Sequence, residues 1–176
     1  MKKGVISLKD LNKFEKIQHW HLIYDEEDPE WKKLNAPYFP LKRVALDEFV
    51  VKHNLSNRTG IFLDGDLIGD ACYYWEHEES NWLEIGLCIY ESEHWGKGYG
   101  KQALVLWINH LFNTMDLVRI GLTTWSANIG MMKLAEKLGM QQEACMRKCR
   151  LWQGKYYDSI RYGILKEEWQ VKVMKE

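Results

Sequence analysis

The sequence predicts an α+β fold in a single domain that covers residues 1–176. Three observations support this prediction. The middle of the chain alternates apolar and polar residues as an antiparallel meander does, and segments on either side carry apolar residues at helical spacing. A glycine-rich stretch then joins the last meander strand to an amphipathic helix. There is no internal repeat, low-complexity tract or linker to suggest a second domain.

The N-terminal third is predicted to contain one strand and two helices. Residues 5–8 read as a short strand, and Asp10 is a suitable N-cap for a helix that continues to about Tyr24. All three prolines fall within residues 25–40, so an irregular loop is expected there, because proline lacks an N–H and blocks helix interiors. This aromatic-rich loop fits a substrate lid and a packed surface loop equally well. Residues 41–55 read as the second helix.

The meander comes next. Strands are predicted at residues 59–63 and 67–75, on either side of the turn dipeptide Asp64-Gly65, and again at residues 82–90 after a polar turn. Alternation along the third strand gives it two faces, one with Leu83, Ile85, Leu87 and Ile89 and the other with Trp82, Glu84, Gly86 and Cys88.

The C-terminal half alternates helices and strands. After the glycine-rich stretch at residues 91–101, the apolar spacing predicts a helix whose apolar side is formed by Ala103, Leu104, Trp107, Ile108 and Leu111. A strand at 117–125 and a helix at 128–138, ended by Gly139, are predicted next. Strands at 140–153 and 155–165 and a helical tail from Lys166 complete the chain.

Composition narrows the possible functions. Twenty-four Lys+Arg against 25 Asp+Glu give a net charge of −1, which disfavours dedicated nucleic-acid binding. The chain has no apolar run long enough for a membrane span, and its N-terminal stretch is too short for a signal peptide, so a cytoplasmic protein is expected. Four cysteines without a C-x-x-C pair fit reduced thiols, and His19 and His21 face different ways on a helix, so no metal site is expected. Nine Trp residues indicate aromatic-lined concave surfaces as well as a core.

The glycine-rich stretch is the strongest functional signal. Gly96, Gly98 and Gly100 lie between a strand and a helix, where backbone N–H groups lack internal partners and glycine allows close approach of a ligand. Such a loop is suited to an anion, most often phosphate. It is not a Walker A loop, because Gln102 follows Lys101 where that motif needs Ser or Thr.

A dinucleotide fingerprint also matches residues 98–103, but its context is wrong. That motif opens a βαβ unit and needs an acidic residue about 20 positions later, whereas this loop follows a meander and no carboxylate lies near Thr123 and Thr124. The match is interpreted as a coincidence, and an NAD-dependent enzyme is kept only as a third hypothesis.

Residues 91–100, which include Trp95-Gly96-Lys97-Gly98-Tyr99-Gly100, resemble the acyl-CoA pyrophosphate loop of the GNAT N-acetyltransferase superfamily. Its motif is Arg or Gln, two residues, Gly, one residue, then Gly or Ala. Residues 125–128 and the Leu-Gly-Met at 138–140 are similar to the superfamily's strand-Asn-helix-Leu-Gly-Phe segment. Residues 83–87 resemble its cofactor-side strand.

The C-terminal part resembles one branch of the superfamily. Arg147 and residues 152–158 look like the ending typical of the RimJ/RimL-type, ribosomal-protein N-acetyltransferase branch, and the Tyr-Phe-Pro at 38–40 suits it. The resemblance covers nearly the whole chain. It implies a mixed, mostly antiparallel sheet flanked by helices, in which two parallel strands, 82–90 and 117–125, splay apart around the pantetheine arm.

The resemblance also implies acetyl-CoA as the cofactor and a set of binding residues. These are Leu87, Cys88 and Ile89 along the strand, the loop residues Trp95, Gly96, Lys97, Gly98, Tyr99, Gly100 and Lys101, and Asn128, for which capping of its helix is an alternative or an additional role. Trp95 replaces the usual Arg or Gln, a substitution that leaves backbone phosphate binding intact. The two lysines are either phosphate partners or solvated loop residues.

Candidate catalytic residues are Glu84 and Ser126. Glu84 matches a position where relatives often carry a catalytic glutamate, and a base must remove a proton from the amine before attack. Its alternatives are a cross-strand salt bridge or a charge that anchors the substrate. The proton donor stays open between Ser126, Cys145, Tyr99 and water, because Ala135 occupies the position where many relatives carry a tyrosine.

The expected reaction is direct acetyl transfer from acetyl-CoA to a primary amine in a ternary complex. The acceptor is either a protein N-terminal amine or a small amine such as a polyamine or drug, and an acidic segment with Glu26, Glu27, Asp28 and Glu30 could attract a basic acceptor. A homodimer is a further possibility. The competing hypothesis is a CoA-binding regulatory module without catalysis, motivated by Ala135.

Overall fold

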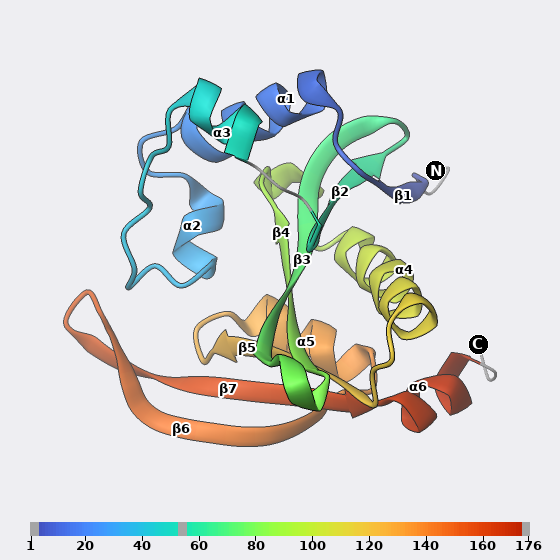
Figure 1. Ribbon diagram of the computed structural model, residues 1–176. Helices are drawn as coiled ribbons and strands as arrows, with labels where there is room; N and C mark the ends of the chain where they lie inside the picture. Colours follow the sequence, from blue (N-terminus) through green and yellow to red (C-terminus); the bar gives the residue numbers. More distant parts are fainter. Residues whose placement is uncertain (1–3, 53–55, 174–176) are drawn as a thin grey trace. The chain divides into compact units, whose positions relative to one another are not determined.

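The computed structural model of the protein describes residues 4–52 and 56–173 and confirms the α+β prediction (Figure 1). Its elements in chain order are β1 (Ile6–Lys9), α1 (Lys13–Tyr24), α2 (Glu30–Leu34), α3 (Leu46–Lys52), β2 (Arg58–Leu63), β3 (Asp66–His77), a 3-10 turn (Glu78–Ser80), β4 (Trp82–Ile89), a 3-10 turn (Ser92–His94), α4 (Tyr99–Thr114), β5 (Arg119–Trp125), α5 (Ile129–Lys137), β6 (Gln141–Trp152), β7 (Lys155–Leu165) and α6 (Lys166–Val173).

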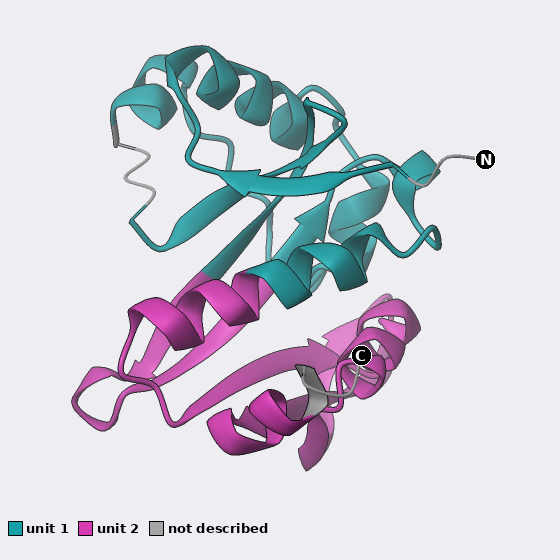
Figure 2. Ribbon diagram, turned by 90° about the vertical axis from the view of Figure 1, so that its right-hand side faces the viewer, with its two compact units in different colours: residues 1–72, 87–106 teal, residues 73–86, 107–176 magenta. Residues whose placement is uncertain are grey.

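The strands hydrogen-bond in the order β1-β2-β3-β4-β5-β7-β6. The chain divides into two compact units, of which the first contains Met1–Cys72 and Leu87–Leu106, and the second contains Tyr73–Gly86 and Trp107–Glu176 (Figure 2). The strands β3 and β4 and the helix α4 each contribute residues to both units. Whether these units behave as one domain, as expected from the sequence, stays a prediction.

The first unit is built on the antiparallel strands β1, β2 and β3. The predicted turn between β2 and β3 is confirmed, since Asp64 and Gly65 have φ values of 52° and 105°, as a two-residue hairpin loop requires. Helices α1 to α3 and the residue after β4 form a buried hydrophobic cluster of five aromatic residues and one isoleucine, made of Trp20, Ile23, Tyr24, Trp31, Phe49 and Tyr90. Several of the tryptophans therefore belong to a core, as the composition suggested.

Three N-terminal predictions need correction. The N-cap of α1 is Asn12 rather than Asp10, because Asn12 and Glu15 form a reciprocal capping box. The segment expected to be irregular contains α2, which begins directly after Pro29, a position where the missing N–H costs nothing. Helix α3 begins at Leu46 rather than Leu41, and the predicted end of this helix, at residues 53–55, lies outside the described residues.

The second unit contains the parallel pair of β4 and β5, with Trp82–Glu84 aligned against Arg119–Gly121. Strand β5 also pairs with β7, and β7 pairs with β6 in a long hairpin (Figure 1). Gly139 ends α5 with a φ of 77°, as predicted for a residue just past a helix. No helix among residues 4–52 and 56–173 is long and apolar enough to span a membrane.

Candidate active site

The glycine-rich loop in the first unit contains glycines with positive φ angles and open space around them. Gly96 and Gly98 have φ values of 72° and 85°, and a Cβ built on either would meet nothing within 4 Å. The first helical bond of α4 runs from the N–H of Gln102 to the carbonyl of Gly98 at 3.2 Å. The amides of residues 99–101 therefore precede the helical ladder, as at any helix N-terminus. A 16-residue helix with an uncrowded glycine cradle before it fits a pyrophosphate group.

Trp95 does not contribute an amide to this cradle. Its backbone N–H donates to the carbonyl of Ser92 at 3.0 Å, and its indole Nε1 donates to the carbonyl of Ile89 at 2.8 Å. Both of its donors are thus used within the chain, so the predicted set of binding amides shortens to residues 96–101. The indole instead ties the loop to the end of β4.

The other loop side chains differ in exposure. Lys97 is exposed, while Tyr99, Gly100 and Lys101 are half-buried at the start of α4. The ring of Tyr99 lies 6.2 Å from that of His94. A phosphate-pairing role for the two lysines stays a prediction.

The end of β4 lies in the same unit as the loop. Gly69 on β3 approaches Cys88 so closely that a Cβ would lie 2.2 Å from the Cys88 carbonyl oxygen, and the Tyr90 N–H donates to Ile68. This close approach explains a glycine at position 69. Burial, reinforced by the charge of Asp70, raises the pKa of the Cys88 thiol well above its usual value, so the thiol stays protonated and is a poor nucleophile.

A buried polar network supports the end of β4. The Tyr90 hydroxyl donates to Asp70 at 2.5 Å and lies 2.9 Å from Nε2 of His19, and Arg58 pairs with Asp70 from the other side. Burial opposes ionisation of Asp70, but the hydrogen bond from His19 and the charge of Arg58 outweigh it and lower its pKa to about 2. Burial and the neighbouring Asp70 raise the pKa of Tyr90 well above 10.0.

In the second unit, Glu84 is 2% exposed and both carboxylate oxygens have partners. The Tyr74 hydroxyl donates to Oε2 at 2.8 Å, and Nη1 of Arg161 lies 3.5 Å from Oε1. Arg161 also pairs with Glu76 at 3.3 Å. Gly121 leaves room for this carboxylate, because a Cβ there would lie 3.0 Å from Cγ of Glu84. The salt-bridge interpretation of Glu84 thus has direct structural support, while its catalytic role stays a prediction.

Three further residues predicted from the sequence lie in this unit. Ser126 Oγ accepts a hydrogen bond from the Asp158 N–H at 3.0 Å, so the hydroxyl proton is not used in that bond. Asn128 caps α5 by accepting from the Met131 N–H at 3.0 Å, which confirms its capping role and leaves its cofactor role a prediction. Ala135 is fully buried within α5.

The histidine pair has no metal-binding arrangement. His19 is buried against Tyr90, whereas His21 bonds Asp25 at 2.9 Å on the surface. Within the described part of the chain, Glu91, Glu93 and His94 bring potential ligand atoms within 4.8 Å of one another. Nε2 of His94 lies 3.4 and 3.6 Å from carboxylate oxygens of Glu91 and Glu93, and whether the group binds a metal stays untested.

Comparison with known proteins identifies the family of the chain. Residues 10–141 match the family model of the acetyltransferase (GNAT) domain. The SPbeta prophage-derived N-acetyltransferase YokL of Bacillus subtilis is 31% identical over 155 residues, which are 85% of this chain and 86% of the relative.

Solved structures agree on the fold. Mutant forms of the spermidine/spermine N-acetyltransferase SpeG of Vibrio cholerae have a TM-score of 0.74 at 19% identity, covering 96% of this chain and 98% of theirs. A ribosomal alpha-N-protein acetyltransferase, RimL, in complex with coenzyme A, has a TM-score of 0.72 at 17% identity, covering 91% and 93%. Because the family model matches most of its length and a relative is 31% identical over 85% of it, the chain belongs to the acetyltransferase (GNAT) family and is an acetyl-CoA-dependent N-acetyltransferase.

Proposed function

We propose that the protein transfers the acetyl group of acetyl-CoA directly to the amine of a peptide or protein acceptor in a ternary complex, as a RimJ/RimL-type enzyme. The observation that carries the proposal is the open cradle at Gly96 and Gly98 before α4. The amides of residues 96–101 bind the pyrophosphate. The main chain of Leu87–Ile89 and the side chain of Asn128 hold the pantetheine arm.

Bound acetyl-CoA supplies an activated thioester carbonyl. The chain must then remove a proton from the acceptor ammonium, since only the neutral amine attacks. Glu84 is the candidate base, directly or through water, and Tyr74 and Arg161 fix its orientation. As the new C–N bond forms and the C–S bond breaks, the nitrogen loses its extra proton to solvent water. The departing thiolate takes a proton for which Ser126 is the candidate donor, and water reprotonates Ser126. A main-chain N–H of Cys88 or Ile89 is the candidate oxyanion partner.

The choice of a peptide acceptor rests on the resemblance of Arg147 and residues 152–158 to the RimJ/RimL-type ending, because the fold alone occurs with both kinds of acceptor. SpeG is named for polyamines and RimL for a ribosomal protein amine, and both share this fold. Four free cysteines support a reducing, cytoplasmic location. Exposed Leu151 and Tyr156, at 54% and 59%, support a dimer contact on the hairpin of β6 and β7.

Thiol release from acetyl-CoA tests the function. The purified protein is incubated with acetyl-CoA and a panel of peptides, polyamines and small amines, and free coenzyme A is measured with a thiol reagent. The proposal expects release that requires a peptide amine. Tight acetyl-CoA binding in calorimetry, with no release on any amine, supports the non-catalytic CoA-binding module instead.

A further inference from the structure

Glu84 in the second unit is almost completely buried, and its two neighbours are not. Only 2% of Glu84 is exposed, and its carboxylate oxygens face Tyr74 on one side and Arg161 on the other. Tyr74 is 42% exposed, and the side chain of Arg161 is 32% exposed. A ligand on this face of the sheet therefore contacts Tyr74 or Arg161 more readily than the carboxylate of Glu84.

Strand alternation explains why Tyr74 and Glu84 share this face. On β3, the ring of Tyr73 stacks on Trp107 of α4 with 6.3 Å between the ring centroids, so the next side chain, that of Tyr74, points to the opposite face. On β5, Gly121 is the residue aligned with Glu84, and its missing side chain leaves the space that the carboxylate occupies. The hydrogen-bonded pair thus lies on the face of the sheet away from Trp107.

The two neighbours of Glu84 differ in what they can do with a proton. The guanidinium of Arg161 has donors but no acceptor, and it stays protonated in proteins. A phenolic hydroxyl both donates and accepts, so Tyr74 can donate to Glu84 while its oxygen accepts a hydrogen bond from an ammonium group. Of these two neighbours, only Tyr74 can therefore pass a proton from a ligand to the buried carboxylate.

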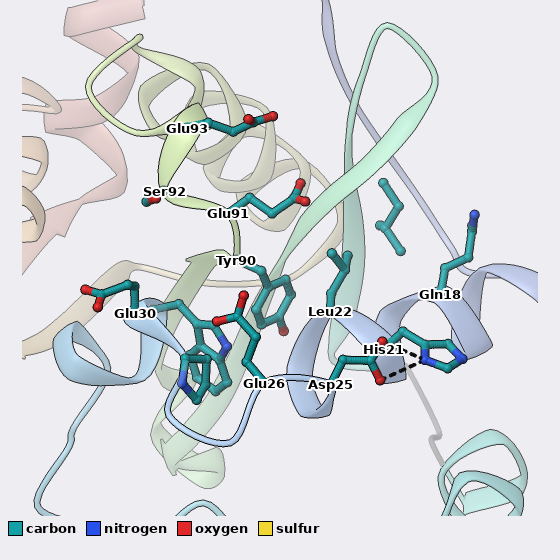
Figure 3. A pocket seen from close by; sticks show the side chains of 13 residues that line it. Gln18, His21, Leu22, Asp25, Glu26, Glu30, Tyr90, Glu91, Ser92 and Glu93 are labelled. Carbon is teal, nitrogen blue, oxygen red and sulfur yellow. Dashed lines mark hydrogen bonds and ion pairs between the residues drawn. The ribbon is translucent and has the colours of Figure 1, made fainter.

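Two further tyrosine–carboxylate pairs differ from this one in burial. Tyr90 lines a cavity at the end of α1 (Figure 3), but it is buried and its hydroxyl donates to the buried carboxylate of Asp70. Tyr162 is also buried, whereas its partner Glu136 lies on the surface, where water reaches the carboxylate directly. Of these three pairs, the one at Tyr74 combines an accessible tyrosine with a buried carboxylate, which is the arrangement that a proton relay requires.

We infer that Tyr74 is a catalytic residue, whose hydroxyl contacts the acceptor ammonium and relays its proton to Glu84. An N–H bond of the ammonium breaks as the phenolic oxygen takes that proton, and the phenolic O–H bond breaks as Oε2 of Glu84 takes the other, so the tyrosine stays neutral. The acceptor is then a neutral amine that can attack. After the product leaves, Glu84 returns the proton through the same hydroxyl to water. This inference rests on the proposed function and names the path of the proton.

Tyr74→Phe removes the hydroxyl and retains the ring. For the peptide of the panel that is acetylated fastest at pH 7, kcat/KM is expected to fall about 100-fold, as for the loss of a general base. Tyr162→Phe is the matched control, because it removes another tyrosine hydroxyl that bonds a glutamate in the same unit, and it is expected to change the rate little. An unchanged rate in Tyr74→Phe overturns the inference.

A weakly basic acceptor separates proton transfer from folding and substrate packing. An aminooxyacetyl group in place of the first residue of the same peptide gives an acceptor nitrogen that is already neutral at pH 7. No proton has to be removed before this nitrogen attacks, so Tyr74→Phe is expected to slow its acetylation little. A misfolded variant, or one whose binding surface is damaged, loses activity toward both acceptors. Equal losses for the two acceptors therefore overturn the relay.

The number of protons in flight separates a relay from a tyrosine that only orients Glu84. In mixtures of H₂O and D₂O, a relay moves two protons together, so a plot of wild-type kcat/KM against the deuterium fraction is expected to curve. Direct transfer to an oriented Glu84 moves one proton and gives a straight line. A straight line, or no isotope effect, overturns the relay while the proposed function stands. If the wild type acetylates no amine at all, it is the proposed function that fails.

Discussion

The Tyr74 hydroxyl donates a 2.8 Å hydrogen bond to Glu84, whose other oxygen faces Arg161 at 3.5 Å. This pair joins β3 to β4 and holds a buried carboxylate in one orientation. Arg161 divides its charge between Glu84 and the more exposed Glu76. Glu84 therefore has a fixed position but shares its positively charged partner with Glu76. Such a position suits a catalytic base as well as a carboxylate that anchors the substrate.

Glu84→Gln tests these two roles. Loss of a base is expected to lower kcat/KM for the amine at least about 100-fold. Glu76→Gln is the matched control, because it removes the other carboxylate paired with Arg161 and is expected to change the rate little. A folded Glu84→Gln enzyme with near-normal kcat and a lowered melting temperature assigns Glu84 a structural role instead.

Gly98→Ala tests the cradle. At a φ of 85° a side chain is strained by about 1–2 kcal/mol, and the added methyl group occupies the open space expected for phosphate. We expect KM for acetyl-CoA to rise at least about tenfold. Gly154→Ala is the control, since Gly154 has a similar φ of 73° in an open turn of the β6–β7 hairpin. Both variants lose similar stability, but only Gly98→Ala should change KM; a parallel rise in the control contradicts the phosphate role.

The network at Asp70 predicts a pH dependence of stability. Its pKa is lowered from 3.8 to about 2, so the ionised group contributes about 2 kcal/mol above pH 3.8, and this contribution is lost as pH falls through about 2. Asp70→Asn leaves Arg58 without its buried counter-charge and is expected to cost about 3 kcal/mol at pH 7. Urea unfolding at pH 7, 4 and 2.5 should show the difference from wild type shrinking with acid. Exposed Asp66→Asn serves as the control.

Local signals in the sequence were sufficient for most of the fold. The turn at Asp64-Gly65, the helix end at Gly139 and the long C-terminal hairpin follow from residue type and spacing, and each is confirmed. The helix α2 was missed because three prolines outweighed a short helix that begins directly after one of them.

The polar contacts around the site were harder to predict from the sequence. Tyr90 meets a histidine 71 positions away, and Arg161 reaches a glutamate 85 positions away. Such pairs depend on strand register and helix packing, which periodicity does not determine. One partial indication of these contacts came from the sequence, because alternation along the strand placed Glu84 on the face away from the apolar side chains. The hydrogen bond from the indole of Trp95 could likewise not be predicted from the sequence, because its acceptor is a backbone carbonyl.

The substitution Ala135→Tyr tests whether the reaction is slowed because α5 carries no proton donor for the departing thiolate. Ala135 is fully buried, and its carbonyl accepts from the Met140 N–H at 3.0 Å, so the helix end is packed around a methyl group. A tyrosine there is expected to overpack the core, lower stability by about 1–3 kcal/mol and leave the rate no higher. Lys133→Tyr, on the exposed side of α5, controls for the effect of the residue type on the helix. If Ala135→Tyr instead folds and releases coenzyme A faster on a peptide amine, the thiolate is protonated from this helix, and Ser126 loses its assignment as the candidate donor.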